Sequence, residues 1–388
     1  MNKLIISFLA ITAAALAVPA MAQESVLYSF NPEADGNPEG RLLLVGKDTL
    51  FGTTYEQGGS PGTVFELKRS GNSWTESTLV TFDGTDGLYP AAGLIADANG
   101  NLYGTTGYGG SDNAGALYEL SPAGASWTEA VLYSFGNDWY YPTSSLIMDS
   151  AGNLYGATNW GGDGDCGTVF ELSPSGGGWT AQVIYSLYCP PGSSGVIMDA
   201  AGNIFGASTS TVFELSPNGN GGWNPTVIHT FAGAPKDGYG AAGVPVLDHA
   251  GNLYGATYSG GTKNYGTVYK LSPITKGKKK GQWNEKILHS FRSSKDGANP
   301  SAGVVLDAAG NIYGTTYYGG KSGVGTVFEL MAPAGTDKYY KEKVLWTFNG
   351  TDGMLPYSPP ILDSAGNLYG TANEGGSYNA GVVFEVTP

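Results

Sequence analysis

The segment from residue 137 to residue 166 combines aromatic and acidic side chains in a pattern suited to binding a sugar. Aromatic rings can stack on the apolar face of a sugar, and tyrosine and tryptophan also carry a polar group that can hydrogen-bond. The candidate ligand-binding residues, which include two on neighbouring loops, are Tyr108, Trp139, Tyr140, Tyr141, Trp160 and Tyr188. The alternative interpretation is that these rings pack one loop against another.

Three carboxylates of the same segment are weak candidates for catalysis, namely Asp138, Asp163 and Asp165. Glycoside hydrolysis requires two carboxyl groups beside the scissile bond, so two of these acids would suffice if folding brought them together. Other chemistries have less support, because the only histidines are His229, His249 and His289. Their separation along the chain disfavours a Ser-His-Asp arrangement and a histidine cluster for zinc, so no metal ligands are predicted.

The N-terminus has the pattern of a secretory signal peptide. Lys3 precedes an apolar run over residues 4–18, and Ala20-Met21-Ala22 forms an Ala-x-Ala site, which predicts cleavage after Ala22. The alternative, a membrane anchor, would need about 18 or more apolar residues. We therefore expect residues 1–22 to be removed, and the mature chain 23–388 to be soluble and secreted or periplasmic.

The two cysteines, Cys166 and Cys189, are predicted to form a disulfide, because paired cysteines in an exported chain favour one. The bond would close a loop of some 24 residues and contribute about 3 kcal/mol in the chain-entropy model. A free thiol or a nucleophilic cysteine is the alternative.

Composition limits the classes of protein to which the chain can belong. Of 388 residues, 62 are glycine and only 13% are charged, and the formal net charge is −14. Nucleic-acid binding is disfavoured because phosphate contacts need clustered Lys and Arg. The aromatic content of 12% and the hydrophobic content of 41% argue against disorder, and the abundance of glycine and tyrosine favours short strands joined by tight turns.

The elements that would position these residues come from a tandem repeat. Four strand-like pieces, A to D, recur in order, with strand A resembling residues 93–97, strand B 101–106, strand C 168–172 and strand D 131–135. The last residue of each strand D falls at Phe30, Phe82, Phe135, Leu187, Phe231, Phe291 and Phe348. The intervals, 44 to 60 residues, are close to the roughly 40–50 residues of a four-stranded propeller blade.

The two ends of the chain complement each other. Residues 26–30 form a lone strand D, and residues 359–386 supply A, B and C without a D. Joining them closes a ring and removes the exposed strand edges of an open array. We therefore predict an all-β fold, a single seven-bladed β-propeller of four-stranded antiparallel blades over residues 23–388. An open β-solenoid is the alternative, but it does not explain the complementary ends.

Most repeated polar residues have a structural interpretation. Aspartates between strands A and B, such as Asp97 and Asp149, are expected to form turns. Glutamates near the end of strand C, such as Glu171, are expected to make a repeated hydrogen bond. A glycine follows an aromatic residue in every strand B, as Gly156 does; such a glycine marks close approach of other backbone or a bulky ring, and packing between blades is the expected use. Asp-Gly pairs between strands D and A also favour turns, with a ring of calcium ligands as the alternative; they begin at Asp35, Asp86, Asp237, Asp296 and Asp352.

Strand order places the unusual residues on one face. In a four-stranded meander the B–C and D–A loops share an edge, which we call the B–C/D–A face. The candidate binding residues, the candidate acids and both cysteines fall on these loops in blades 2 to 4. Blade 4 lacks the Gly-Gly loop between strands B and C, and this is expected to leave a notch beside them.

The repeat resembles that of the GloVer family of secreted tandem-repeat proteins, over essentially residues 26–388. The family pattern Gly-Asn-Leu-Tyr-Gly-Thr-Thr…Gly-Gly…Gly-Thr-Val-Phe-Glu-Leu stands here at 311–316, 319–320 and 325–330. The resemblance implies extracellular placement and a propeller-like fold, but it implies no reaction.

The sequence therefore favours a secreted, monomeric, non-catalytic module that binds a carbohydrate, another extracellular polymer or a protein partner on the B–C/D–A face. The alternatives are a propeller glycosidase or polysaccharide lyase, and a structural envelope protein. No cofactor is predicted, with calcium as the alternative, and neither nucleic-acid binding nor a membrane span is expected.

Overall fold

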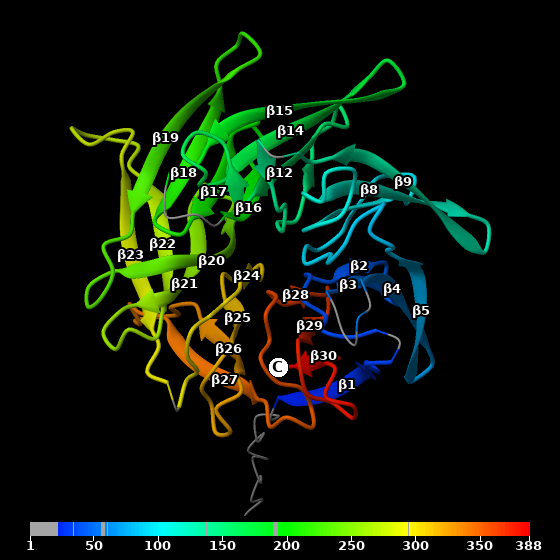
Figure 1. The fold of residues 1–388 in the computed structure, drawn as a ribbon. Helices are drawn as coiled ribbons and strands as arrows, with labels where there is room; N and C mark the ends of the chain where they lie inside the picture. Colours follow the sequence, from blue (N-terminus) through cyan, green and yellow to red (C-terminus); the bar gives the residue numbers. More distant parts are fainter. Residues whose placement is uncertain are drawn as a thin grey trace, which may run out of the picture.

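A computed structural model describes residues 22–33, 35–55, 59, 61–136, 138–188, 193–293 and 295–388. Within these ranges the chain forms 30 β-strands and no helix. Seven antiparallel four-stranded sheets stand around a common axis, and one two-stranded sheet is added to a loop (Figure 1). The predicted seven-bladed propeller is therefore confirmed.

Blades 1 to 3 run outward from the axis in chain order. Blade 1 consists of β2 (Leu43–Val45), β3 (Thr49–Thr54), β4 (Thr63–Ser70) and β5 (Ser73–Thr81). Blade 2 consists of β6 (Ile95–Ala96), β7 (Leu102–Thr106), β8 (Ala116–Ala123) and β9 (Ser126–Ser134). Blade 3 consists of β11 (Ile147–Met148), β12 (Leu154–Thr158), β14 (Thr168–Ser175) and β15 (Gly178–Ser186), and its loops pair as β10 (Trp139–Tyr140) with β13 (Trp160–Gly161).

Blades 4 to 7 repeat this order. Blade 4 consists of β16 (Ser193–Met198), β17 (Ile204–Ser208), β18 (Thr211–Pro217) and β19 (Trp223–Thr230). Blade 5 consists of β20 (Gly238–Leu247), β21 (Leu253–Gly260), β22 (Thr267–Pro273) and β23 (Trp283–Ser290). Blade 6 consists of β24 (Val305–Leu306), β25 (Ile312–Thr316), β26 (Thr326–Met331) and β27 (Lys341–Thr347). Blade 7 consists of β28 (Ile361–Leu362), β29 (Leu368–Ala372), β30 (Val382–Thr387) and β1 (Gln23–Ser29).

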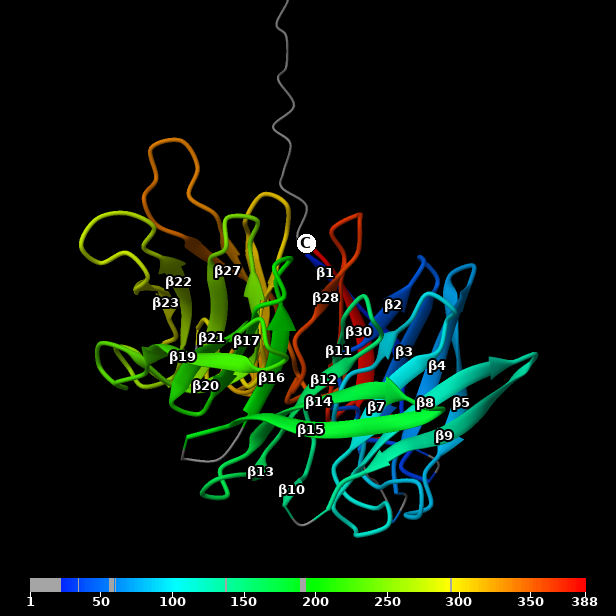
Figure 2. The ribbon, with the colours of Figure 1, turned by 90° about the horizontal axis from the view of Figure 1, so that it is seen from above.

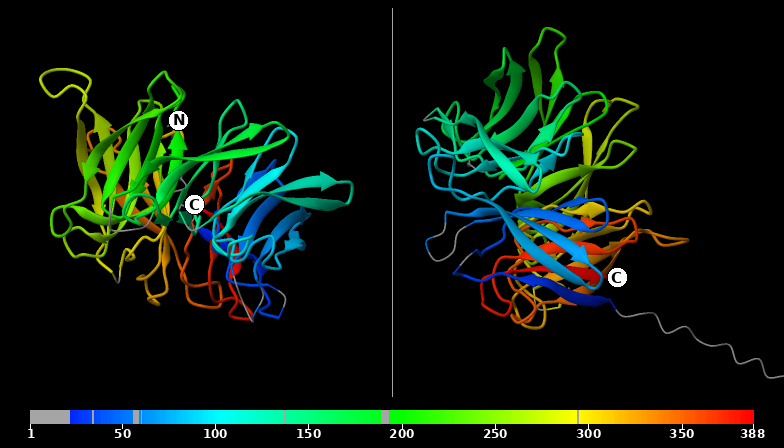
Figure 3. Two further views of the ribbon diagram at one scale, coloured as in Figure 1. Left: turned by 45° about the horizontal axis from the view of Figure 1, so that its top comes forward. Right: turned by 90° about the vertical axis from the view of Figure 1, so that its right-hand side faces the viewer.

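The N-terminal strand closes the ring, as the sequence predicts. β1 pairs antiparallel with β30, from Gln23 opposite Thr387 to Ser29 opposite Val382. Figures 1 and 3 both place the blue β1 strand against the red β30 strand. Phe30, which follows β1, is fully buried against Phe65 of blade 1, with 5.1 Å between ring centroids. Closure therefore completes blade 7 and also seals its contact with blade 1.

The core is divided among the junctions between blades. Seven clusters of buried apolar residues each combine side chains from two neighbouring blades. At the junction of blades 4 and 5, for example, Phe205 and Phe231 pack with Leu253 and Tyr269. Because every blade buries one face against each neighbour, no blade is expected to be stable outside the ring.

The strand B glycines make room for an aromatic ring of their own blade. A Cβ on Gly156 would lie less than 3.0 Å from the ring of Phe170, its partner in the sheet register. The prediction that these glycines serve packing between blades is wrong in this respect, because the ring that requires the glycine comes from strand C of the same blade.

The turn between strands A and B ties three strands together in most blades. In blade 3 the Asp149 carboxylate accepts hydrogen bonds from the backbone amide and the side chain of Asn153, at 2.9 and 2.8 Å. The Tyr155 hydroxyl lies 3.1 Å from Asp149 and 3.4 Å from Glu171 of strand C. The predicted turn aspartate and the predicted repeated hydrogen bond of glutamate thus belong to one network.

A pair of acidic residues lies at five of the seven junctions in the described part of the chain. Each pair joins a glutamate of strand D to the aspartate of the preceding D–A loop. The pairs are Glu24–Asp352, Glu76–Asp35, Glu129–Asp86, Glu285–Asp237 and Glu342–Asp296. We call them the junction acid pairs.

The aspartate of each junction acid pair accepts a backbone hydrogen bond within its own loop, which confirms the turn interpretation. Burial, followed by the negative charge of Asp86, raises the pKa of Glu129 to about 7. Burial and Asp352 do the same for Glu24.

The two edges of the ring carry different loops. Figure 2 shows β10 and β13 at one edge, which is the B–C/D–A face, and the orange loop between β26 and β27 at the opposite edge. Among the described residues no helix is long and apolar enough to cross a membrane.

Candidate functional site

The D–A loops form a rim that joins each blade to the next on the B–C/D–A face. Tyr141 adopts a positive φ of 61° immediately before Pro142. Its amide donates to the carbonyl of Ala114 in blade 2, at 3.0 Å, and its carbonyl accepts from the amide of Asn159 in blade 3, at 3.1 Å. Tyr89 makes the equivalent contacts one blade earlier, with a φ of 60°. The backbone thus fixes these tyrosines on the B–C/D–A face.

Four tyrosines form a chain of ring contacts over blades 1 to 3. Tyr55 stacks on Tyr89 with 5.2 Å between centroids. Tyr108 meets Tyr89 edge to face at 5.9 Å and Tyr141 at 4.9 Å. Offset-stacked and edge-to-face contacts of this kind are the favourable arrangements for aromatic pairs.

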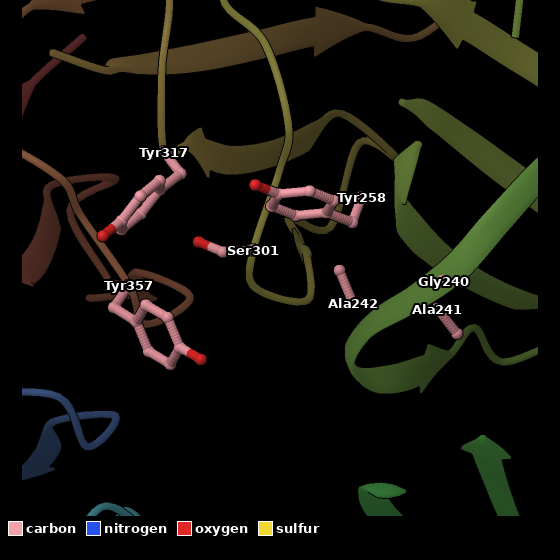
Figure 4. Close-up of a pocket in the computed structure, with 7 residues that line it drawn as sticks. All are labelled: Gly240, Ala241, Ala242, Tyr258, Ser301, Tyr317 and Tyr357. Atoms are coloured by element: carbon pink, nitrogen blue, oxygen red, sulfur yellow. The ribbon is translucent and has the colours of Figure 1, made fainter. Parts of the chain in front are cut away.

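Three more tyrosines line a hollow of about 360 Å³ over blades 5 to 7 (Figure 4). Tyr258 comes from the end of strand B in blade 5, Tyr317 follows strand B in blade 6, and Tyr357 lies in the loop entering blade 7. Tyr258 is 42% exposed and Tyr357 is 48% exposed, so their rings are accessible. Ser301 adds a hydroxyl to the same wall.

The two groups of tyrosines approach each other across the axis. Burial, then the charge of Glu39 and the hydroxyls of Tyr141 and Tyr258, raises the pKa of Tyr357. We call the set the tyrosine collar: Tyr55, Tyr89, Tyr108, Tyr141, Tyr258, Tyr317 and Tyr357.

Glu39 is the acid of the collar. Its charge acts on Tyr55, Tyr317 and Tyr357, so it lies within electrostatic range of these three side chains. Burial raises its pKa to about 7, although a 3.0 Å hydrogen bond from the side-chain amide of Asn373 opposes the shift. The collar therefore combines ring faces and hydroxyls with an acid that titrates near neutral pH.

The predicted binding residues divide between the collar, the core and the outer loops. Tyr108 and Tyr141 belong to the collar. Trp139 is only 9% exposed and packs on Tyr133, Phe135 and Phe170, so its ring belongs to the core. The other three lie on blade 3 loops: Tyr140 pairs with Trp160 across β10 and β13, where Trp160 is 39% exposed, and Tyr188 is 61% exposed.

The three predicted acids lie close to the same loops of blade 3. Asp138 and Asp163 line a second, open hollow of about 660 Å³, together with Trp139 and Tyr185. Asp165 accepts a 2.8 Å hydrogen bond from the amide of Gly161 and lies 3.3 Å from the Tyr140 hydroxyl. Asp165 therefore helps to shape the loop, whereas Asp138 and Asp163 face the hollow.

Of the two cysteines that are predicted to form a disulfide, only Cys166 lies among the described residues. Cys166 is buried in the B–C loop of blade 3, 2% exposed. Cys189 lies outside the described residues, as does the predicted signal peptide apart from Ala22. The Cys166–Cys189 bond and the cleavage site remain predictions.

Sequence reasoning missed most of the collar, because it searched for departures from the repeat. Tyr55, Tyr258 and Tyr317 occupy the same place after the second strand of their blades, so they read as part of the pattern. The sequence did contain one signal for these residues. Three blades have tyrosine at this position, whereas the other four have glycine, asparagine or threonine.

Comparisons with solved structures show the fold that the chain shares. Virginiamycin B lyase from Staphylococcus aureus is similar with a TM-score of 0.59 and 11% identity, covering 95% of this chain and 99% of the lyase. A candidate 6-phosphogluconolactonase from Bacteroides fragilis has a TM-score of 0.55 and 14% identity, covering 84% and 87%. A protein from Lactobacillus plantarum has a TM-score of 0.52 and 17% identity, covering 80% and 86%. These likenesses establish a shared fold alone.

Comparison of sequences gives the family. Among curated proteins none matches the chain. The sequence profile of the Gloeobacter/Verrucomicrobia repeat matches twice, over residues 17–210 and 190–388, which together cover every blade. The resemblance stated from the repeat is thereby confirmed, and the chain belongs to the Gloeobacter/Verrucomicrobia repeat family.

Proposed function

We propose that the protein is an extracellular, non-catalytic binding module that takes a carbohydrate on the tyrosine collar. The observation that carries this proposal is the hollow lined by Tyr258, Tyr317 and Tyr357. Its volume of about 360 Å³ lies within the roughly 300–1,000 Å³ of small-ligand sites.

The chemistry of the collar suits a neutral sugar. Ring faces supply apolar stacking surface, while the tyrosine hydroxyls and Ser301 can exchange hydrogen bonds with sugar hydroxyls. Glu39 and Asn373 supply an acidic and an amide group beside them. A nucleic acid or a strongly anionic polymer is a poor ligand here, because the chain carries a net charge of −14.

Binding to an array of neutral and acidic polysaccharides tests the proposal. We expect retention on at least one neutral glycan and about tenfold weaker binding by Tyr317→Ala, the loss that follows from about 1.4 kcal/mol of stacking. The matched control is Tyr339→Ala, because Tyr339 is 73% exposed in the loop at the opposite edge. Equal losses in both variants, or no retention of the wild type, would refute sugar binding by the collar.

One observation favours a second candidate, an enzyme that cleaves the bound polymer. A carboxyl group with a pKa near 7 is the kind of general acid that glycoside cleavage requires, and Glu39 meets this condition. Release of reducing ends or unsaturated sugars from the retained glycan would support this function, provided that Glu39→Gln abolishes product but preserves retention.

A further inference from the structure

The junction of blades 4 and 5 brings a histidine and two acids together away from the collar. His229 lies in β19, Asp237 in the loop that follows it, and Glu285 in β23 of the next blade. His229 Nε2 is 3.3 Å from Asp237 Oδ2 and 3.4 Å from Glu285 Oε1, and all three ligand atoms lie within 4.8 Å of one another. The three side chains are only 10–19% exposed.

The next junction provides an internal comparison, because it has the same residue types at the same positions. There His289 Nε2 makes a 3.2 Å hydrogen bond with Asp296 Oδ2, and Glu342 lies nearby. At the junction of blades 6 and 7 the Trp346 indole N–H donates to Asp352 at 3.1 Å. In both places an N–H group satisfies the aspartate.

At the junction of blades 4 and 5 the equivalent contact between His229 Nε2 and Asp237 Oδ2 is 3.3 Å long and does not have hydrogen-bond geometry. His229 Nε2 and Glu285 Oε1 are therefore buried without a hydrogen bond among the residues that the structure describes, whereas at the next junction only the glutamate oxygen, Glu342 Oε1, is in this state. Buried polar atoms in native proteins nearly always have a partner, so each exception calls for a missing group such as an ion. Together with a carboxylate oxygen of Asp237 they lie within 4.8 Å of one another.

We propose that His229, Asp237 and Glu285 form a three-ligand zinc site that joins blade 4 to blade 5. With zinc–ligand bonds of about 2.0–2.1 Å, neighbouring ligand atoms of a tetrahedral ion lie about 3.3–3.4 Å apart. The two distances from His229 Nε2 match this separation. Three protein ligands leave the fourth position for water.

The donor set distinguishes zinc from the common hard cations. Calcium and magnesium prefer six or more oxygen ligands, whereas one imidazole nitrogen and two carboxylate oxygens suit zinc and its neighbours in the first transition row. Asp237 is held in place by the amides of Ala232 and Gly238, at 2.7 and 2.6 Å. Such outer contacts are what orient a metal-binding carboxylate.

Equilibrium dialysis of the full protein, prepared without a polyhistidine tag, against zinc chloride tests the site. Metal content is measured by mass spectrometry, and cobalt chloride serves as a spectroscopic probe of four-coordinate geometry. We expect one zinc per chain, at least about tenfold weaker binding in His229→Asn and Glu285→Gln, and an unchanged stoichiometry in the control His289→Asn.

Folding is checked separately, so that loss of binding cannot come from loss of structure. Zinc is expected to raise the thermal midpoint of the wild type and of His289→Asn but not of His229→Asn, whose circular dichroism should match the wild type. Absence of zinc from the wild type, or equal binding by His229→Asn, would overturn the proposal. Neither outcome bears on sugar binding, because the two sites share no residue.

Discussion

Replacing Glu129 by glutamine should stabilise the protein at neutral pH and leave it unchanged in acid. Glu129 lies beside Asp86 at the junction of blades 1 and 2, and its Oε1 is buried without a hydrogen-bond partner among the described residues. When Glu129 ionises, two negative charges face each other in a half-buried place. Glutamine keeps the shape and removes one of those charges.

The magnitude follows from the pKa difference between the folded and unfolded chain. Burial and Asp86 raise the pKa of Glu129 from 4.5 to about 7, which corresponds to about 3 kcal/mol at 1.36 kcal/mol per pKa unit. Because the group is only half-buried, solvent screening reduces the expected effect to about 1–2 kcal/mol.

The sign is set by linkage between protonation and folding. Since the folded pKa is the higher one, the stability that protonated Glu129 contributes is fully present below pH 4.5 and is lost as the pH rises through about 7. The stability of Glu129→Gln does not fall over this interval, because glutamine does not ionise. The difference in free energy of unfolding between the variant and the wild type should therefore increase progressively between pH 4.5 and pH 8.

Urea unfolding at pH 4.5, 6, 7 and 8, followed by tryptophan fluorescence, measures the difference in free energy of unfolding. Asp86→Asn should give a smaller gain, because it removes the repulsion but leaves the Glu129 carboxylate buried, and the double variant should gain no more than Glu129→Gln alone. A difference that does not change with pH, or a variant less stable than the wild type at pH 8, would refute the reasoning.

Three further predictions concern packing and closure. Gly156→Ala should destabilise the fold by about 1–3 kcal/mol, because its Cβ would meet the Phe170 ring. The matched control Gly178→Ala, whose Cβ would find only an ordinary 3.9 Å contact, should stabilise by up to about 1 kcal/mol in the same urea titration. Trp139→Ala should lower the free energy of unfolding by about 3–5 kcal/mol, because the ring is buried. In the control Tyr188→Ala the change should be less than about 0.5 kcal/mol, because Tyr188 is exposed. Similar losses in the two variants would contradict the assignment of Trp139 to the core. Deletion of residues 23–30 should expose the β30 edge and cause aggregation in size-exclusion chromatography, and a synthetic peptide of those residues should reverse it; a deletion variant that stays compact would show that closure is dispensable.

The architecture could be predicted because each of its determinants is local and repeated. Asp149 and Asn153 are four residues apart and make the same turn in several blades, so the sequence pattern alone reveals it. The closure of the ring could be predicted for the same reason, because the last blade lacks a strand D and the N-terminal segment supplies one. Trp139 shows the limit of this reasoning. Its place in a loop favoured an exposed ring, but the ring packs against Phe170 in the core.

The site depends on contacts between blades, which no local pattern contains. Tyr141 and Tyr357 approach each other only because the ring turns their loops toward a common axis. His229 and Glu285 are 56 positions apart and meet because blade 5 follows blade 4. The sequence expectation of no metal ligands considered the histidines as a group, and so it did not weigh a set in which the second blade supplies a carboxylate.

The pairing of β1 with β30 also determines the order in which the molecule can be completed. During synthesis β1 leaves the ribosome first, and its partner strand leaves last, because Gln23 pairs with Thr387. Six blades can form from neighbouring segments, whereas the seventh requires a contact that spans the whole chain, the kind that forms slowly. β1 therefore stays unpaired while the other blades assemble, and during that time its free edge can pair with another chain.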